Sequence, residues 1–382
     1  MKIIKLLASR ATFTFLLLAA FFLNNGLSKR NDKVNKTLAK QLQKILEQQK
    51  DLYKIPGISA ALITSNGQKW IGVCGYSAEN DSMKPEMLFG LASVSKTYVA
   101  ALVLRLVEEK KLSLDDSIKQ WLPSMNFIDG AITIRQLLNH TSGLYRYQGS
   151  PKWFQAITTN DEKIWLPKEI INTFLDKPAG NPGKVWGETA ADYVLIGMII
   201  EKATGYKAAD LLREKILTPL KLNHTYLYPD ETISSEKLAH FWWDVNRTGN
   251  LVDVFPIGSK TPLASMFSSV WTSGAILSTA EDLTIFSKAL FEGRILSDSS
   301  FKQMITPMQL GNSPKYGFSV VIDTIEGKIV YWHTGGSGYT SVFYYIPENK
   351  LSIAVLCDSF VDPKPIAVEL YKEFKGYNNF KK

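Results

Sequence analysis

Ser93-Val94-Ser95-Lys96 stands at the head of an apolar run from Tyr98 to Val107, and this junction decides the fold. The run is typical of a buried helix, and Gly90-Leu91-Ala92 leads into it. Side chains three positions apart lie on one face of a helix, so the Lys96 amine can reach the Ser93 hydroxyl. We therefore expect a helix over residues 93–110 that carries a nucleophile and a base on its first turn.

Spacing alone does not single out this pair. Ser-x-x-Lys also begins at Ser234 and at Ser299, but there the surrounding residues are polar. Those two motifs are typical of the starts of surface helices. The long apolar run and the small residues around Ser93 distinguish the first motif from the others.

The pair has a clear chemical use. A serine hydroxyl is a weak nucleophile until a base removes its proton, and burial lowers the pKa of a lysine so that it can act as that base. The first N–H groups of a helix are free to face a developing oxyanion, and the helix dipole favours negative charge there. Ser93 and Lys96 are thus candidate catalytic residues.

A second segment of interest is Trp332-His333-Thr334-Gly335-Gly336-Ser337-Gly338. The pattern predicts a strand that ends in an exposed polar pair, followed by glycines that let a backbone approach a ligand closely. The other interpretation is a glycine-rich turn whose histidine is satisfied locally.

The remaining pattern predicts an α+β fold. Helical spacing of apolar residues predicts helices at about 34–52, 133–139, 167–175, 191–204, 208–216 and 279–291, the last capped by Ser278 or Thr279, and a final helix around 366–374. Strands are expected at 58–64, 69–75, 328–332, 340–346 and 351–357. Strands at both ends with helices between them predict one antiparallel sheet of about five strands, flanked by helices and carrying an inserted, mainly helical lobe.

The net charge of +8 comes from the N-terminus. Residues 1–54 hold 11 Lys and Arg against 3 Asp and Glu, whereas the rest of the chain holds 33 of each sign. The body is neutral overall, which argues against a nucleic-acid partner.

The first 28 residues are typical of an export signal. Lys2, Lys5 and Arg10 precede a 13-residue apolar stretch, 11–23, which is short for a membrane span. Residues 1–28 are therefore a cleaved signal peptide or an uncleaved N-terminal anchor, and we expect a periplasmic or extracellular protein.

Cys74 and Cys357 lie in two predicted strands. An oxidising compartment would permit a disulfide between them. We favour two free thiols that behave as small hydrophobic side chains.

These motifs together resemble the serine β-lactamase and penicillin-binding-protein-like hydrolases, including class C β-lactamases, D-alanyl-D-alanine carboxypeptidases, esterases and D-aminopeptidases. The resemblance extends from about residue 55 to 371. Its landmarks are residues 89–96 (Phe-Gly-Leu-Ala-Ser-Val-Ser-Lys), 137–144 (Leu-Leu-Asn-His-Thr-Ser-Gly-Leu), 193–205, 278–283 (Ser-Thr-Ala-Glu-Asp-Leu) and 333–336 (His-Thr-Gly-Gly). It implies one β-lactamase-like domain over 33–382, with a sheet lobe at about 33–92 and 263–382 and a helical lobe at about 93–262.

The resemblance also implies roles for individual residues. Ser93 would be acylated and Lys96 would be its proton partner. His333 would be a catalytic residue at the start of the strand motif that often reads Lys-Thr-Gly, with Thr334 and Gly335 binding substrate. The backbone N–H groups of Ser93 and Gly336 would form the oxyanion hole.

One landmark departs from the family pattern. The family usually carries Tyr-x-Asn where this chain has Glu188-Thr189-Ala190. In one interpretation Glu188 replaces the tyrosine, as a carboxylate base or as the ionic partner of Lys96. Otherwise Tyr145 or Tyr147 fills the position from a neighbouring loop, or turnover has been lost.

The expected function is that of an exported serine hydrolase, acting through an acyl-enzyme on amides or esters of peptide, cell-wall or small-molecule type. The alternative is a degenerate module that binds peptidoglycan or a partner protein without turnover.

We expect a monomer with no cofactor, and the sequence shows no metal motif. His140 is interpreted as structural, and His224 and His240 as surface or packing residues. Aromatic residues in loops 145–185 and 225–262 predict either an apolar cleft wall or packing between the lobes.

Overall fold

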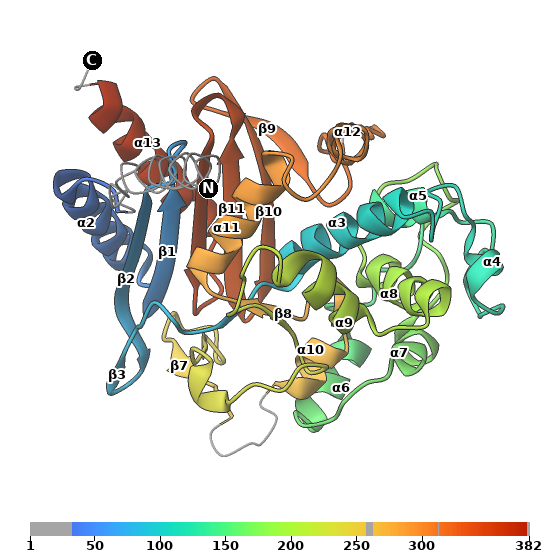
Figure 1. The fold of residues 1–382 in the computed structure, drawn as a ribbon. Coiled ribbons are helices and arrows are strands. Elements are labelled where there is room, and N and C mark those ends of the chain that lie inside the picture. The colour runs from blue at the N-terminus through green and yellow to red at the C-terminus, as the bar shows by residue number, and fades with distance from the viewer. Residues whose placement is uncertain (1–32, 257–262, 312, 380–382) are drawn as a thin grey trace, which may run out of the picture.

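A seven-stranded antiparallel sheet brings together the two ends of the chain in the computed structural model, which describes residues 33–256, 263–311 and 313–379 (Figure 1). The strand order is β3-β2-β1-β12-β11-β10-β9. The strands are β1 (Gly57–Ile63), β2 (Lys69–Ala78), β3 (Asp81–Ser82), β9 (Val321–Ile325), β10 (Lys328–Ser337), β11 (Tyr339–Ile346) and β12 (Leu351–Cys357). The predicted antiparallel sheet is confirmed, with two strands more than expected. The additional strands, β3 and β9, are its two edges, where short and half-exposed segments leave a weak sequence pattern.

The central strands are buried on both faces. Ile58, Ala60 and Leu62 of β1 pack toward α2 (Lys36–Tyr53) and α13 (Lys364–Asn379). Ala61 joins the other core, which includes α11 (Ala280–Phe291). This two-sided burial explains why β1 and β12 are mostly apolar rather than alternating, with one serine in each.

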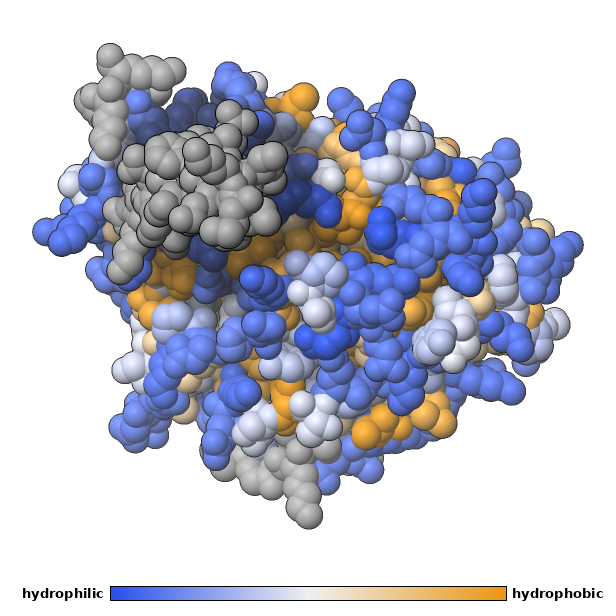
Figure 2. Space-filling model, viewed as in Figure 1, coloured by the Kyte–Doolittle hydropathy of each residue, from blue (hydrophilic) through white to orange (hydrophobic). Residues whose placement is uncertain are grey.

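Helices fill the space beside the sheet. They are α3 (Ser95–Glu108), α4 (Ile118–Trp121), α5 (Ile134–Leu138), α6 (Pro151–Thr159), α7 (Pro167–Phe174), α8 (Ala190–Thr204), α9 (Ala208–Leu212), α10 (Ala264–Ser268) and α12 (Asp298–Ile305), with the π-helical turn η2 (Arg213–Leu217) and the 3₁₀ turns η1 (Ala92–Val94), η3 (Ser235–Lys237), η4 (Trp271–Ser273) and η5 (Pro347–Asn349). The predicted helices are confirmed with small shifts at their ends, and Thr279 caps α11 by accepting a hydrogen bond from the Asp282 N–H. On the face seen in Figure 2, hydrophilic residues cover most of the surface and hydrophobic residues show in the recesses between elements.

Two small sheets connect the large sheet to the helices. One has the order β4-β8-β5 and the other pairs β6 with β7. Their strands are β4 (Phe89–Gly90), β5 (Tyr226–Leu227), β6 (Trp242–Trp243), β7 (Val252–Asp253) and β8 (Ile276–Ser278). Since β4 leads directly into η1 and α3, its pairing with β8 helps to fix the position of Ser93.

The prediction for the end of β10 was wrong. The strand continues through Gly335 and Gly336 to Ser337, and His333 is buried rather than exposed. A Cβ atom on Gly335 would lie 2.1 Å from the Leu91 carbonyl oxygen. These glycines therefore continue the strand, and at Gly335 the missing side chain lets β10 pass close to η1.

The two cysteines are free, as predicted. Cys74 on β2 and Cys357 on β12 both stand in register with Ile58, on opposite sides of β1. Two strand spacings separate them by roughly 10 Å, which is beyond the reach of a disulfide.

The predicted leader, residues 1–28, lies outside the described residues. Among residues 33–256, 263–311 and 313–379, none of the helices combines the length and the apolar character needed to cross a membrane.

Candidate active site

Ser93 and Lys96 lie together where η1 meets the first turn of α3. The Lys96 Nζ atom donates a hydrogen bond of 2.7 Å to Ser93 Oγ. The lysine is 2% exposed, whereas Ser93 keeps part of its surface accessible. At the other two motifs, Ser234 and Ser299 are exposed on the surface, as their polar surroundings predict. Of the three motifs, the first is the one that pairs a partly accessible serine with a buried lysine.

The turn that presents Ser93 is held from two sides. Ala92 adopts a left-handed conformation with φ of 45°, which costs a non-glycine residue about 1–3 kcal/mol. The Leu91 carbonyl accepts a 2.7 Å hydrogen bond from Ser341 Oγ on β11. Ile276 on β8 makes two further bonds. Its carbonyl accepts a hydrogen bond from the Leu91 N–H at 2.8 Å, and the Ile276 N–H donates to Ser95 Oγ at 3.0 Å. These contacts maintain the unfavourable backbone geometry.

Glu188 faces Lys96, at 3.0 Å between Oε1 and Nζ. It immediately precedes Thr189, the N-cap of α8. The Gly187 N–H donates to the His140 carbonyl at 3.0 Å, and Gln148 Nε2 donates to the Glu188 carbonyl at 3.4 Å. The loop after α5 thus fixes the backbone that aims this carboxylate at the lysine.

The two tyrosines considered for this position have other environments. Tyr147 is buried, and its hydroxyl donates to the Ser269 carbonyl at 2.7 Å. Tyr145 is half-buried, and its carbonyl accepts from Thr189 Oγ1 at 2.9 Å. In the described part of the chain, Glu188 is the residue that forms an ion pair with Lys96.

Burial and charge set the protonation of this pair. Burial lowers the pKa of Lys96 below its usual value, although the Glu188 carboxylate partly offsets this effect. Burial would raise the pKa of Glu188, but the neighbouring positive charges, that of Lys96 first among them, and the hydrogen bond from Lys96 together outweigh burial, so the net pKa falls. Glu188 is therefore ionised at neutral pH, and Lys96 loses its proton more readily than an exposed lysine does.

His333 is neutral at physiological pH, since burial lowers its pKa to about 4. Its Nδ1 lies 2.7 Å from the Thr334 carbonyl, so Nδ1 carries the proton and donates it. Nε2 then accepts a 2.9 Å hydrogen bond from the Tyr316 hydroxyl. His333 therefore does not supply the positive charge that the lysine of Lys-Thr-Gly would carry.

A buried polar cluster supports the loop beside Glu188, in keeping with the structural role expected of His140. His140 Nδ1 lies 2.6 Å from one Asp192 oxygen, and Ser142 Oγ donates to the other at 2.5 Å. Asp192 and Tyr316 were not among the predicted site residues. An acidic residue within the otherwise apolar helix α8 is unusual, and this could have identified Asp192 as a buried polar residue. Nothing in the sequence connects Tyr316 with His333.

Within the described residues, no strand pairs with the outer side of β10 beside Ser93. β9 pairs with β10 only as far as Trp332, so Thr334, Gly335 and Gly336 form an edge beyond that pairing. A Cβ atom on Gly335 would lie 2.9 Å from the Ser93 nitrogen. The structure therefore brings the expected substrate strand next to the nucleophile.

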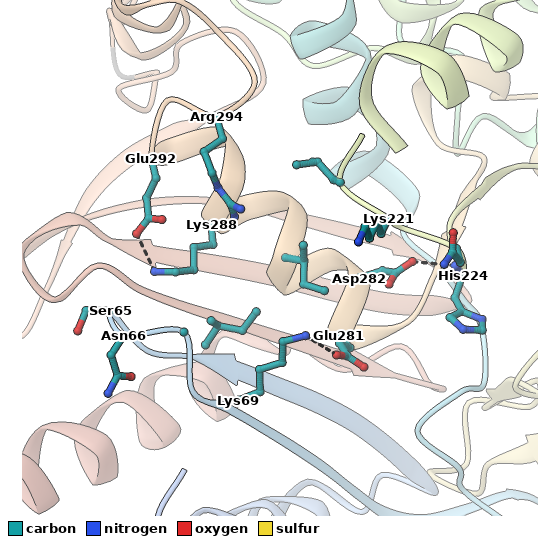
Figure 3. Close-up of a pocket in the computed structure, with 15 residues that line it drawn as sticks. Ser65, Asn66, Lys69, Lys221, His224, Glu281, Asp282, Lys288, Glu292 and Arg294 are labelled. Atoms are coloured by element: carbon teal, nitrogen blue, oxygen red, sulfur yellow. Dashed lines mark hydrogen bonds and ion pairs between the residues drawn. The ribbon is translucent and has the colours of Figure 1, made fainter. Parts of the chain in front are cut away.

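A cavity of about 640 Å³ lies elsewhere, between the turn after β1, the loop before β5 and α11 (Figure 3). Its wall carries the ion pairs of Lys69 with Glu281 and Lys288 with Glu292, at 2.9 and 2.6 Å. Ser93 does not line it. Because its charges largely neutralise each other and it lacks the buried pair, we place the chemistry at Ser93. No cluster of three or more His, Cys, Asp or Glu side chains that could hold a metal occurs in the described ranges.

Known proteins match most of this chain. The family model Beta-lactamase matches residues 42–375. Penicillin-binding protein 4* of Bacillus subtilis (strain 168) is 31% identical over 294 residues, which cover 73% of this chain and 63% of the relative. The D-aminopeptidase of Brucella ovis is 24% identical over 314 residues, which cover 80% of this chain and 56% of the relative. The chain thus spans less than two thirds of the length of either curated relative. The solved D-stereospecific amidohydrolase from Streptomyces sp. superposes with a TM-score of 0.73 at 28% identity, covering 87% of this chain and 97% of that one.

The low pKa of His333 predicts a pH-dependent loss of stability. An unfolded histidine has a pKa of 6.5, whereas folded His333 has a pKa of about 4. At pH values between these two, the unfolded chain therefore binds a proton at this position that the folded chain does not. The free energy of unfolding should therefore fall as the pH falls through this window, by on the order of 3 kcal/mol from this group. Urea unfolding of wild type and His333→Gln at pH 7, 6, 5 and 4 measures how the free energy of unfolding changes with pH. We expect the wild type to lose more stability than the variant, and parallel curves would contradict this account of His333.

Proposed function

The chain belongs to the β-lactamase family, and on this premise we propose that it is a serine hydrolase that forms an acyl-enzyme on Ser93. The observation that carries the proposal is the line of contacts from Ser93 through Lys96 to Glu188, at 2.7 and 3.0 Å. A nucleophile, a buried base and a carboxylate that orients the base form the arrangement used by catalytic triads. Had Glu188 pointed to solvent, the arrangement would have favoured a binding module without turnover.

Acylation begins with Lys96 in its neutral form. Ser93 Oγ bonds to the substrate carbonyl carbon while its proton moves to Lys96 Nζ. The Glu188 carboxylate stabilises the ammonium group that forms, as the aspartate of a serine protease triad stabilises its imidazolium. When the tetrahedral intermediate collapses, the C–N or C–O bond breaks and Lys96 returns the proton to the leaving amine or alcohol. The acyl group remains on Ser93.

The negative oxygen of the intermediate needs hydrogen-bond donors that are already in place. We assign this role to the backbone N–H groups of Ser93 and Gly336, with Thr334 and Gly335 bordering the bound substrate. One such donor is typically worth 10²–10³ in rate. In deacylation the oxygen of a water molecule bonds to the acyl carbon while its proton moves to Lys96 Nζ. When this second intermediate collapses, the bond between the acyl carbon and Ser93 Oγ breaks, Lys96 returns the proton to Oγ, and the acid product leaves. Glu188 keeps 28% of its side chain exposed, so solvent reaches this end of the pair.

The substrate is proposed to be an amide or ester of peptide, cell-wall or small-molecule type. The names of two similar proteins, a D-aminopeptidase and a D-stereospecific amidohydrolase, favour an amide that contains a D-residue.

We propose that the chain divides into a sheet lobe at about 33–92 and 263–382 and a helical lobe at about 93–262. The reacting groups then come from both lobes: Lys96 and Glu188 from the helical lobe, Gly336 from the sheet.

We also propose that the protein is exported, with residues 1–28 as signal peptide or anchor. The basic and apolar stretches of this segment support the proposal. Cell fractionation followed by N-terminal sequencing should find the protein outside the cytoplasm, either shortened by about this segment or membrane-bound with the segment retained. Recovery of the full-length chain from the cytosol would contradict it.

Covalent labelling tests the proposed function. We expect a fluorophosphonate probe or a fluorescent penicillin to add one label to the wild type, detected by intact mass, with Ser93 as the modified residue. Ser93→Ala should abolish labelling, because the hydroxyl is the nucleophile. Lys96→Ala should slow labelling by about a hundredfold or more, in line with the loss of a general base.

The matched control is Ser299→Ala, since Ser299 has the same Ser-x-x-Lys spacing but lies exposed on α12. This variant should label like the wild type. If neither probe adds to Ser93, the hydrolase proposal fails and the non-catalytic binding module becomes the better account.

A further inference from the structure

Three exposed aromatic rings form a continuous row beside the candidate active site, which we call the aromatic row. They are Phe154 on α6, Trp243 on β6 and Phe360 after β12. Phe360 stacks on Trp243 with ring centroids 6.3 Å apart and an interplanar angle of 21°. Trp243 in turn meets Phe154 at 6.5 Å and 59°. In Figure 1, α6 and the hairpin containing β7 lie at the lower ends of the helices and the sheet, so the row crosses from one to the other.

The aromatic row begins at the strand that flanks the nucleophile. A Cβ atom on Gly336 would lie 3.3 Å from the Phe360 ring, so the ring lies directly over this glycine. The hairpin that carries Trp243 is tied to the same region, because the Trp242 N–H donates to the Asp358 carbonyl at 2.7 Å. The ring contacts therefore lead from the oxyanion strand to α6 in the helical lobe.

Packing between elements does not account for these rings. Phe154, Trp243 and Phe360 remain 49%, 37% and 67% exposed. Single exposed aromatics are ordinary on a protein surface, but here Trp243 contacts a ring on each side, and a contiguous apolar patch typically marks a binding site. Rings of this kind bind other rings by stacking or edge contacts.

The position of the row indicates which part of a substrate it meets. The leaving group must lie near the proton that Lys96 returns, and Lys96 and Glu188 both belong to the helical side. Phe360 covers Gly336 on the sheet side, where the carbonyl oxygen of the acyl group is held. The row therefore starts beside the acyl half of the substrate.

We propose that the aromatic row is an acyl-group subsite and that the enzyme prefers amides and esters whose acyl group ends in an aromatic ring. This inference rests on the proposed function, since it assigns a substrate class to the same site. The ring of the acyl group stacks on Phe360 and Trp243, and Phe154 closes the far end of the subsite.

Two p-nitrophenyl esters with the same leaving group test the subsite: the acetate and the 4-phenylbutyrate. We expect the wild type to hydrolyse the phenylbutyrate with a kcat/KM about tenfold higher, corrected for the spontaneous rates, as is usual for one apolar group bound in a subsite. Trp243→Ala and Phe360→Ala should remove most of this preference, measured as the ratio of the two kcat/KM values. Tyr206→Ala is the control, because Tyr206 is also a highly exposed aromatic but follows the far end of α8 from Glu188.

The outcomes separate this inference from the proposed function. Ser93-dependent hydrolysis of both esters without an aromatic preference, or a preference that survives both substitutions, overturns the acyl subsite alone. Absence of Ser93-dependent hydrolysis of either ester overturns the proposed function and the subsite with it. A preference lost in Trp243→Ala and Phe360→Ala but kept in Tyr206→Ala supports the subsite.

Discussion

The buried amine of Lys96 is the constraint on which the rest of the site depends. An ammonium group removed from water is strongly unfavourable unless a partner compensates for the lost hydration, and breaking such a pair typically costs 3–5 kcal/mol. Glu188 is that partner at 3.0 Å, so the loop that carries it must be held as firmly as the helix that carries Lys96. Two hydrogen bonds hold this loop: the His140 carbonyl accepts from the Gly187 N–H, and Gln148 Nε2 donates to the Glu188 carbonyl. The same burial lowers the pKa of Lys96 and makes it usable as a base.

The two halves of the site come from different parts of the chain. The sheet supplies the edge of β10 beyond its pairing with β9 and the hydrogen bond that holds the turn before Ser93, and the helices supply the base and the carboxylate. Gly335 joins the halves, since any side chain there would collide with the Leu91 carbonyl. Each element is pinned by long-range contacts, and this rigidity suits a site that must hold its groups in place before the substrate arrives.

Local patterns predicted much of this arrangement. The apolar run after Ser93 identified α3, and strand patterns near both ends of the chain predicted the antiparallel sheet. The reach of Lys96 to Ser93 followed from helix geometry. Contacts between distant segments could not be predicted in this way. The burial of His333 and its bond to Tyr316 depend on how two segments meet, and the two glycines after His333 are as typical of a turn as of a strand in close contact. The sequence left open whether Glu188 or a tyrosine faces Lys96, because that choice depends on the path of the loop after α5.

The pH dependence of the reaction of Ser93 with a fluorophosphonate, in wild type and Glu188→Gln, tests the central claim most directly. The acid limb of the rate profile reports the apparent pKa of the coupled group that must lose its proton, which in this account is Lys96. Since the Glu188 carboxylate raises the pKa of Lys96, its removal should move the acid limb to lower pH. It should also lower the maximal rate, because the ammonium formed on proton transfer loses its partner. An acid limb and a maximal rate that both stay at their wild-type values would contradict the claim that Glu188 acts through Lys96.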